Sequence, residues 1–238
     1  MKYSFESRVR FSEVDENAYL TLPAMINYLQ DCATFHGEEG NVGVYWTAEH
    51  KKMWVLAALR LEIIEYPKFA ENIITSTWAS GFRNFIGYRD FTIERPDGTR
   101  LVGGKSEWVF MDRKTGMPCG VTKDQIDGYG VHPELALEDR YGKRKIRIPE
   151  ELREGRSFRI LESHLDTNHH VNNGQYMIMS QNCLPPGTEV HHLRAEYVKQ
   201  AFLGDEILPC VAEKEGVYTV VLKNRNSGDI YFIGEFAG

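Results

Sequence analysis

The chain has 238 residues, of which 42% are hydrophobic and 26% are charged, and its formal net charge is −6. This composition is that of a globular protein with a sizeable core, and the acidic balance argues against broad binding of nucleic acid or anionic membranes. No apolar run is long enough to span a membrane, the N-terminal residues do not resemble a secretory signal peptide, and the four cysteines lack metal-ligand spacing. We therefore expect a cytoplasmic protein with reduced thiols and no metal or other cofactor.

The first half of the sequence predicts one long helix followed by consecutive strands. Alternating residues predict a strand over 5–11, and Thr21 with Pro23 marks the start of a helix over 22–38. A loop over 41–52 should follow. The β-like runs are 54–64, 73–80, 85–94 and 102–110, with a turn at 95–98 between the last two. This order is typical of an α+β fold in which a sheet wraps over a helix.

Residues 112–150 lose this pattern and are interpreted as a linker, because they contain three prolines and a basic run over 140–147. The second half then repeats the order of the first. We expect a helix over 173–181, followed by strands over 191–199, 206–213, 218–224 and 230–235.

An internal repeat supports this organisation. Residues 163–183 align with residues 12–32 without a gap at an offset of 151, and the identities include Asp15 with Asp166 and Asn17 with Asn168. Two later patches align at an offset of 134: residues 59–62 with 193–196, and 70–73 with 204–207. Repeats on this scale indicate duplicated structural units. Because Tyr19 of the first copy corresponds to His170 of the second, we expect one working site and one degenerate site.

The most informative stretch runs from Asp166 to Asn173. It places a carboxylate, a carboxamide and an imidazole at alternate positions: Asp166, Asn168 and His170. On an extended backbone these three side chains would point to one side, where they could orient and deprotonate a water molecule. The asparagines that follow are suited to cap the next helix. The alternative interpretation is a polar turn with surface histidines.

This stretch resembles the catalytic signature of the acyl-acyl-carrier-protein thioesterases of plant plastids and bacteria. The same resemblance extends to several other motifs in the order found in that family: Asn27–Ala33, Trp54-Val55, Tyr66-Pro67, Trp78-x-Ser80, Arg89-Asp90 and Ser106-x-Trp108-Val109. It implies two tandem hotdog folds, each a helix wrapped by an antiparallel sheet. We therefore expect an N-terminal hotdog over 1–125 with the degenerate site and an acyl-chain pocket, a linker over 126–150, and a catalytic hotdog over 151–238.

The resemblance also implies hydrolysis of the thioester that joins a fatty acyl chain to acyl carrier protein. We expect Asp166 and His170 to activate a water, with Asn168 holding it or the thioester carbonyl, and backbone N–H groups at the following helix start to receive the oxyanion. A covalent route with Asp166 as the nucleophile is the alternative. The sequence departs from the family pattern at Gln200, where an acidic residue is usual. Glu196, on the same predicted strand, is a candidate for the missing charge.

Three further expectations concern binding. Met25, Leu29 and Trp54 are candidates for the acyl pocket, although apolar residues at such spacing are more often plain core. The basic residues Lys143, Arg144, Lys145 and Arg147 are candidates for docking an acidic carrier protein, the alternative being a solvated linker. The protein should be a monomer or a homodimer. Rival functions are an acyl-coenzyme A thioesterase, a hydratase or dehydratase on the same fold, and a non-catalytic acyl-binding module.

Overall fold

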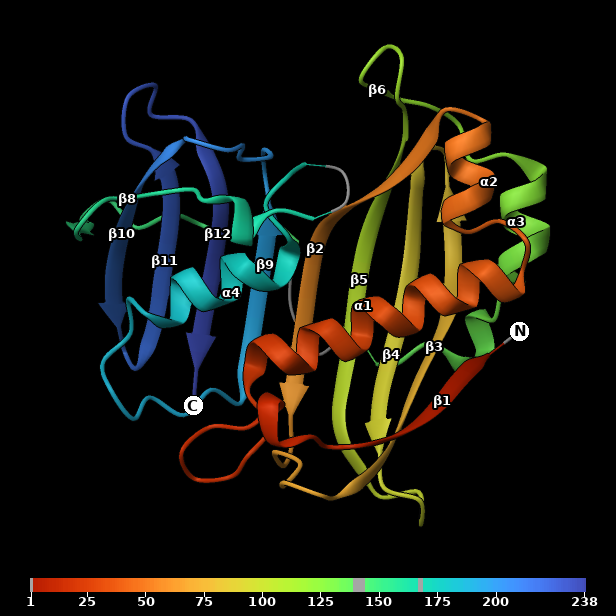
Figure 1. Cartoon of the computed structure of the whole chain (residues 1–238), viewed down its shortest axis with the longest axis horizontal. Helices are drawn as coiled ribbons and strands as arrows, with labels where there is room; N and C mark the ends of the chain where they lie inside the picture. The colour runs from red at the N-terminus through yellow and green to blue at the C-terminus, as the bar shows by residue number, and fades with distance from the viewer. Residues whose placement is uncertain (1, 139–143, 167–168) are drawn as a thin grey trace. The chain divides into compact units, whose positions relative to one another are not determined.

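The computed structural model describes residues 2–138, 144–166 and 169–238. The chain divides into two compact units, one comprising Met1–Ala57 with Glu62–Arg140 and the other comprising Ala58–Leu61 with Tyr141–Gly238. Each unit pairs a helix with an antiparallel sheet (Figure 1). Both are hotdog folds, as the sequence predicts.

In the first unit, α1 (Leu22–Glu39) lies across a sheet with the strand order β1-β3-β4-β5-β2 (Figure 1). The strands are β1 (Tyr3–Arg8), β2 (Lys52–Ile63), β3 (Asn72–Arg83), β4 (Ile86–Glu94), β5 (Arg100–Asp112) and the short β6 (Met117–Pro118). The predicted Thr21 cap is confirmed, because the Thr21 side chain accepts from the Ala24 N–H at 3.3 Å. The predicted turn at 95–98 is also present, with Gly98 at a φ of 87°.

Two predictions about connecting segments need correction. The expected loop over 41–52 contains a short helix, α2 (Val44–Glu49). Within residues 112–150, which were interpreted as a linker, α3 (Lys123–Tyr129) packs on the first unit, where Tyr129 is buried with Val42 and Ala79. Each of these helices is too short for apolar residues at helical spacing to stand out from the surrounding residues, which include glycines and prolines.

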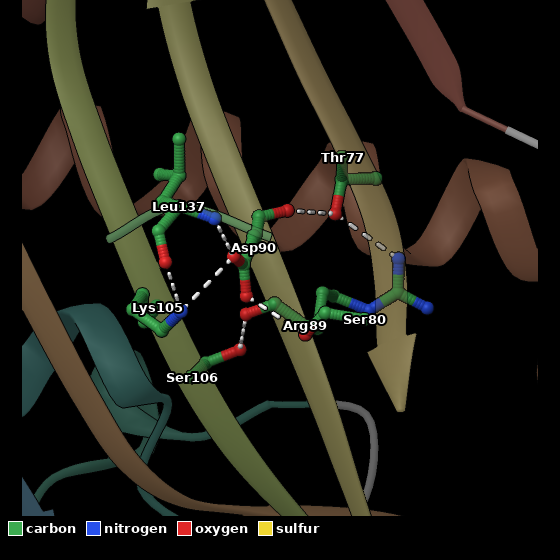
Figure 2. A network of polar contacts seen from close by, with 7 residues as sticks. All are labelled: Thr77, Ser80, Arg89, Asp90, Lys105, Ser106 and Leu137. Carbon is green, nitrogen blue, oxygen red and sulfur yellow. Dashed lines mark hydrogen bonds and ion pairs between the residues drawn. The ribbon is translucent and has the colours of Figure 1, made fainter. Parts of the chain in front are cut away.

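A buried polar network fixes the chain that follows α3 against the first sheet (Figure 2). Asp90 on β4 is fully buried, and its carboxylate accepts hydrogen bonds from the Ser80 hydroxyl at 2.9 Å and the Leu137 N–H at 2.7 Å. Lys105 on β5 lies 3.3 Å from the same carboxylate and donates to the Leu137 carbonyl at 2.7 Å. Because Ser80, Leu137 and Lys105 all donate to the Asp90 carboxylate, its buried charge is tolerated.

In the second unit, α4 (Asn173–Gln181) accompanies a sheet with the order β9-β12-β11-β10. The strands are β9 (His192–Tyr197), β10 (Glu206–Lys214), β11 (Val217–Asn224) and β12 (Ile230–Ala237), and the two-residue strands β7 (Arg153–Glu154) and β8 (Phe158–Arg159) both pair with β10. The helix and these four longer strands lie within a few residues of their predicted positions, because their apolar periodicity is strong.

Candidate active site

The start of α4 anchors the candidate site. Asn172 is the N-cap, and its side-chain oxygen accepts from the Gly174 N–H at 2.8 Å. The Asn172 N–H in turn donates to the carbonyl of His164 at 2.9 Å. The predicted asparagine cap is therefore confirmed. The Gly174 N–H is already engaged by this cap and is not available to a developing oxyanion.

The segment between His164 and the cap folds back on itself. Leu165 and Val171 form an antiparallel bridge, and the Asp166 N–H donates to the carbonyl of His170 at 2.8 Å. The Asp166 carboxylate accepts from the His170 N–H at 3.3 Å. We call the described residues that these bonds join, 165–166 and 169–171, the second-copy turn. The prediction of an extended backbone is wrong, since these bonds close a turn and His169 has a φ of 60°.

A turn of the same design occurs in the first unit at residues 14–20, which we call the first-copy turn. There Val14 bridges Leu20, the Asp15 N–H donates to the Tyr19 carbonyl at 2.8 Å, and the Asp15 carboxylate accepts from the Tyr19 N–H at 2.9 Å. Ala18 has a φ of 64°, like His169. The backbone device is thus duplicated, and the imidazole of His170 replaces the phenol of Tyr19.

Residues related by the offset of 134 also make equivalent hydrogen bonds to the two turns. Leu20 donates to the Pro67 carbonyl at 2.8 Å in the first unit, and Val171 donates to the Ala201 carbonyl at 3.1 Å in the second. The residue after each carbonyl contacts the turn. Lys68 lies over the ring of Tyr19, and the ring of Phe202 meets that of His170 edge to face at 5.1 Å.

Tyr176 on α4 completes the surroundings of the second-copy turn. Its phenol oxygen accepts from the Ala201 N–H at 3.0 Å. Burial raises the pKa of Tyr176 to about 12, and the nearby carboxylates of Asp205 and Asp166 act in the same direction. The phenol is therefore neutral at physiological pH and acts as a hydrogen-bond acceptor rather than as a base.

The predicted catalytic residues have different outcomes. The structure places Asp166 and His170 on one turn, both half-buried, whereas Asn168 lies outside the described residues. His169 is exposed, as predicted. Gln200 does not share a strand with Glu196, because β9 ends at Tyr197, so the predicted common face is wrong. Gln200 instead directly precedes Ala201, whose carbonyl binds the turn.

Glu196 already has a structural partner. Its carboxylate accepts from the backbone N–H of Ile146 at 3.2 Å. Ile146 belongs to a buried cluster with Cys210, Val221 and Ile233 in the second unit. This contact favours the interpretation of Glu196 as a structural carboxylate.

The hydrogen bond between Ile146 and Glu196 also fixes the position of the basic run. Ile146 is buried, while its neighbours Lys145 and Arg147 are exposed and Arg144 is half-buried. The Lys145 carbonyl accepts from Arg194 at 3.3 Å. Lys143 lies outside the described residues. The described part of the run is therefore held on the surface of the second unit.

The acyl-pocket candidates lie in the first unit. Met25 and Leu29 on α1 are fully buried, as core residues are. Trp54 is half-buried, its indole N–H donates to Gln125 at 2.8 Å, and its ring lies 4.8 Å from that of Phe110. Among these three residues, only Trp54 retains appreciable exposed surface.

Sequence reasoning missed Ala201 and Phe202 as neighbours of His170. The signal was present in the repeat, since both correspond at the offset of 134 to Pro67 and Lys68 beside the first-copy turn. Among the described residues, no group of three or more His, Cys, Asp or Glu side chains is placed to hold a metal ion. Within that same part of the chain, no helix has both the length and the apolarity to cross a membrane.

The family model described as "Acyl-ACP thioesterase N-terminal domain" matches residues 1–129, which is more than half of the chain. The chain belongs to the acyl-ACP thioesterase family. This match covers the first-copy turn, α1 and the first sheet. The resemblance drawn from the sequence motifs is confirmed.

Curated relatives agree with this assignment. The chain is 28% identical over 194 residues to oleoyl-acyl carrier protein thioesterase 1, chloroplastic, of Arabidopsis thaliana, covering 74% of this chain and 53% of the relative. It is 26% identical over 247 residues to acyl-[acyl-carrier-protein] hydrolase FATB3, chloroplastic, of Cuphea viscosissima, covering 93% and 59%. The chain thus spans little more than half the length of these relatives.

Solved structures show the same fold. An acyl-ACP thioesterase from Bacteroides thetaiotaomicron superposes with a TM-score of 0.84 at 22% identity, covering 99% of this chain and 97% of the other. The 12:0-ACP thioesterase from Umbellularia californica superposes with a TM-score of 0.86 at 16% identity, covering 99% and 96%.

Proposed function

We propose that the protein is a thioester hydrolase that releases free fatty acid from acyl-acyl carrier protein and so ends chain elongation. The observation that carries this proposal is the substitution of His170 for Tyr19 on an otherwise duplicated turn, in a chain of the acyl-ACP thioesterase family. The hydrogen bonds described in the second-copy turn have counterparts in the first-copy turn, where the residue is a tyrosine, so the imidazole is not required to build the turn. A chemical role accounts for its presence.

In the proposed reaction, His170 acts as the general base toward a water molecule. A neutral imidazole accepts a proton at cellular pH. The Asp166 carboxylate is held at the mouth of the turn by the His170 N–H, so it can orient that water or stabilise the imidazolium. Asn168 is assigned to hold the water or the thioester carbonyl. A covalent route with Asp166 as the nucleophile uses the same geometry.

Gln200 is proposed to assist by hydrogen bonding from its place beside Ala201, because an amide can orient a carbonyl or a water but cannot act as a base. Glu196 is the weaker candidate, since it accepts the Ile146 N–H. Trp54 remains the preferred acyl contact, whereas Met25 and Leu29 are fully buried and are assigned to the core.

Acyl carrier protein is the proposed partner, and Lys145 with Arg147 is its proposed docking surface. Both side chains are exposed on an acidic chain, and the buried Ile146 between them fixes their position. Basic residues of this kind steer an acidic partner. We assign the protein to the cytoplasm because all four cysteines are free thiols.

The test is the release of free thiol from medium- and long-chain acyl-carrier-protein thioesters by the wild type and the His170→Ala variant. We expect the variant to lose about two orders of magnitude or more in turnover. His169→Ala is the matched control and should retain full activity, because His169 is exposed on the same turn. Equal activity of His170→Ala and the wild type would refute the catalytic assignment.

Thiol release together with hydration and binding measurements separates the rival functions. Faster hydrolysis of acyl-coenzyme A than of the carrier-protein thioester at equal acyl length would favour a coenzyme A thioesterase. Hydration of an enoyl thioester without thiol release would indicate a hydratase. Binding of the substrates without any turnover would indicate an acyl-binding module.

A further inference from the structure

The second unit contains a cavity of about 560 Å³ beside α4, which we call the edge pocket. Its lining includes Arg156, Phe158, His164, Met179, Cys183 and Pro209. This volume falls within the range of small-molecule binding pockets. The pocket borders the second-copy turn at His164, but neither Asp166 nor His170 belongs to its lining.

The repeat explains how the pocket arises. In the first unit, β1 pairs with β3 without interruption from Arg8 to Tyr3. The equivalent strand in the second unit starts in the same register, with Arg159 opposite Glu206, but breaks into β8 and β7. The break faces Pro209, which has no N–H to donate to a neighbouring strand. The chain bulges there at Gly155, whose N–H donates to the Pro209 carbonyl at 2.8 Å.

Different side chains occupy the equivalent space in the two units. In the first unit, the rings of Phe5 and Tyr28 stack at 6.2 Å, and the Tyr28 hydroxyl donates to Glu13 at 2.7 Å. At the repeat offset of 151, the corresponding residues are Arg156, Met179 and His164. Two aromatic rings are thus replaced by an arginine and an unbranched thioether. The space that these rings fill in the first unit is part of a cavity in the second.

The charge of the site changes as well. Glu13 and Asp31 of the first unit correspond to His164 and Asn182 in the second, so two carboxylates are removed. The Nδ1 atom of His164 accepts from the Leu161 N–H at 3.1 Å, so the neutral ring presents Nε2–H as a donor. Arg156 replaces the uncharged Phe5 and adds one cation, whereas Arg153 corresponds to Lys2, which is already cationic. The lining carboxylate Glu154 lies 3.5 Å from the ammonium of Lys223.

Part of the pocket lining is apolar. Phe158 from β8, Met179 and Ile178 from α4, and Val211 from β10 contribute hydrocarbon surface to it. A lining that combines this apolar surface with cationic and N–H donors is complementary to a molecule with an aliphatic body and an anionic head.

We propose that the edge pocket binds a fatty-acid anion at a site separate from the catalytic turn. The aliphatic chain lies along Phe158, Met179 and Val211, and the carboxylate is held by Arg156 with His164. The choice of a carboxylate head rests on the proposed function, whose product is a fatty acid. The pocket reaches His164, the residue before the second-copy turn, so a ligand here lies next to the segment that carries Asp166 and His170.

Cys183 supplies a local reporter for this proposal. It lines the pocket and is half-buried, whereas Cys32 and Cys210 are fully buried. Burial raises the pKa of the Cys183 thiol, so its alkylation should be followed at mildly alkaline pH. In a Cys119→Ser background, dodecanoate at about ten times its dissociation constant should slow alkylation of Cys183 about tenfold, by mass action. Dodecan-1-ol at the same concentration should protect much less.

Two variants locate the ligand. Arg156→Phe combined with Met179→Tyr installs the side chains of the first unit and should abolish protection of Cys183 by dodecanoate. If that pair fails to fold, Arg156→Gln replaces the guanidinium with a smaller neutral amide and should weaken protection chiefly through loss of the charge. Arg83→Gln, an exposed arginine in the first unit, is the control and should leave protection unchanged.

Turnover does not enter this readout. The His170→Ala variant should show full protection whether or not the protein hydrolyses thioesters, so failure of the proposed function and failure of the edge-pocket proposal are distinguishable. Absence of protection by dodecanoate, or equal protection by dodecanoate and dodecan-1-ol, would overturn the proposal of an anion site.

Discussion

The phenol oxygen of Tyr176 accepts a hydrogen bond from the backbone N–H of Ala201 at 3.0 Å, in the buried surroundings of the candidate site. The first unit has Met25 and Pro67 at the corresponding positions. Proline has no N–H, so no acceptor is needed there. The two units thus avoid an unpaired N–H at this position in different ways. In both, the carbonyl of the same residue, Pro67 or Ala201, accepts a hydrogen bond from the turn.

Removing this acceptor should destabilise the second unit. We expect Tyr176→Phe to lower the free energy of unfolding by about 1–3 kcal/mol, because the buried Ala201 N–H loses its partner. Denaturant titration measures the change. Tyr176→Met with Ala201→Pro copies the first unit and should cost less than the sum of its single substitutions; strict additivity would show that the hydrogen bond is not the cause.

The paired turns allow structure and catalysis to be separated. Asp166→Asn and Asp15→Asn each weaken a carboxylate that accepts a backbone N–H, so we expect similar losses of about 1 kcal/mol in unfolding free energy. Only Asp166→Asn should lower turnover, by about two orders of magnitude or more. Kinetics and denaturation on the same preparations check both outcomes. A comparable loss of turnover in Asp15→Asn would assign the effect to folding.

The buried Asp90 network is not part of the second-copy turn, but removing it should lower the free energy of unfolding substantially. Asp90→Ala removes the acceptor of Ser80 and Leu137 and the counter-charge of Lys105, so we expect a loss of about 3–5 kcal/mol. Ser80→Ala is the milder control, at about 1 kcal/mol. Unfolding monitored by tryptophan fluorescence is suitable, because all four tryptophans lie in the first unit.

One ion pair gives a pH-dependent prediction. The hydrogen bond from Lys52, assisted by backbone N–H groups, lowers the pKa of Asp112 from 3.8 to about 2. A lowered folded-state pKa contributes stability that is present above the unfolded pKa and is lost as pH falls through the folded value. We expect wild type and Asp112→Asn to differ in thermal midpoint at neutral pH and to converge between about pH 4 and pH 2. A constant difference across that range would contradict the assignment.

Reversing the exposed charges of the basic run tests carrier docking. Lys145→Glu with Arg147→Glu should raise KM for the carrier-linked substrate about tenfold, because the reversed charges repel the acidic carrier surface, and should leave KM for acyl-coenzyme A, which has no protein surface to dock, much less affected. Arg83→Glu makes a single charge reversal on the first unit as a control. An unaltered KM for the carrier-linked substrate would remove the docking surface from the proposal.

Much of the fold was predictable because the local signals are strong. The side chains of Thr21 and Asn172 cap the two long helices. Apolar and polar residues alternate clearly in the strands of both units, so the ends of these elements lie within a few residues of prediction. The helices α2 and α3 were missed because segments of six and seven residues give too little periodicity. The backbone of the Asp166–His170 segment was mispredicted because polar residues suit a turn as well as a strand.

By itself, the sequence determined that the chain is duplicated, where its main helices and strands lie, and that His170 distinguishes the second copy from the first. These properties depend on neighbouring residues and on spacing along the chain. Only the tertiary structure decided that Ala201 and Phe202 meet the second-copy turn, that Glu196 is engaged by Ile146, and that a pocket opens opposite Pro209. Each of these joins segments distant in sequence, and the physical reason is that long-range packing and strand pairing determine which distant residues meet.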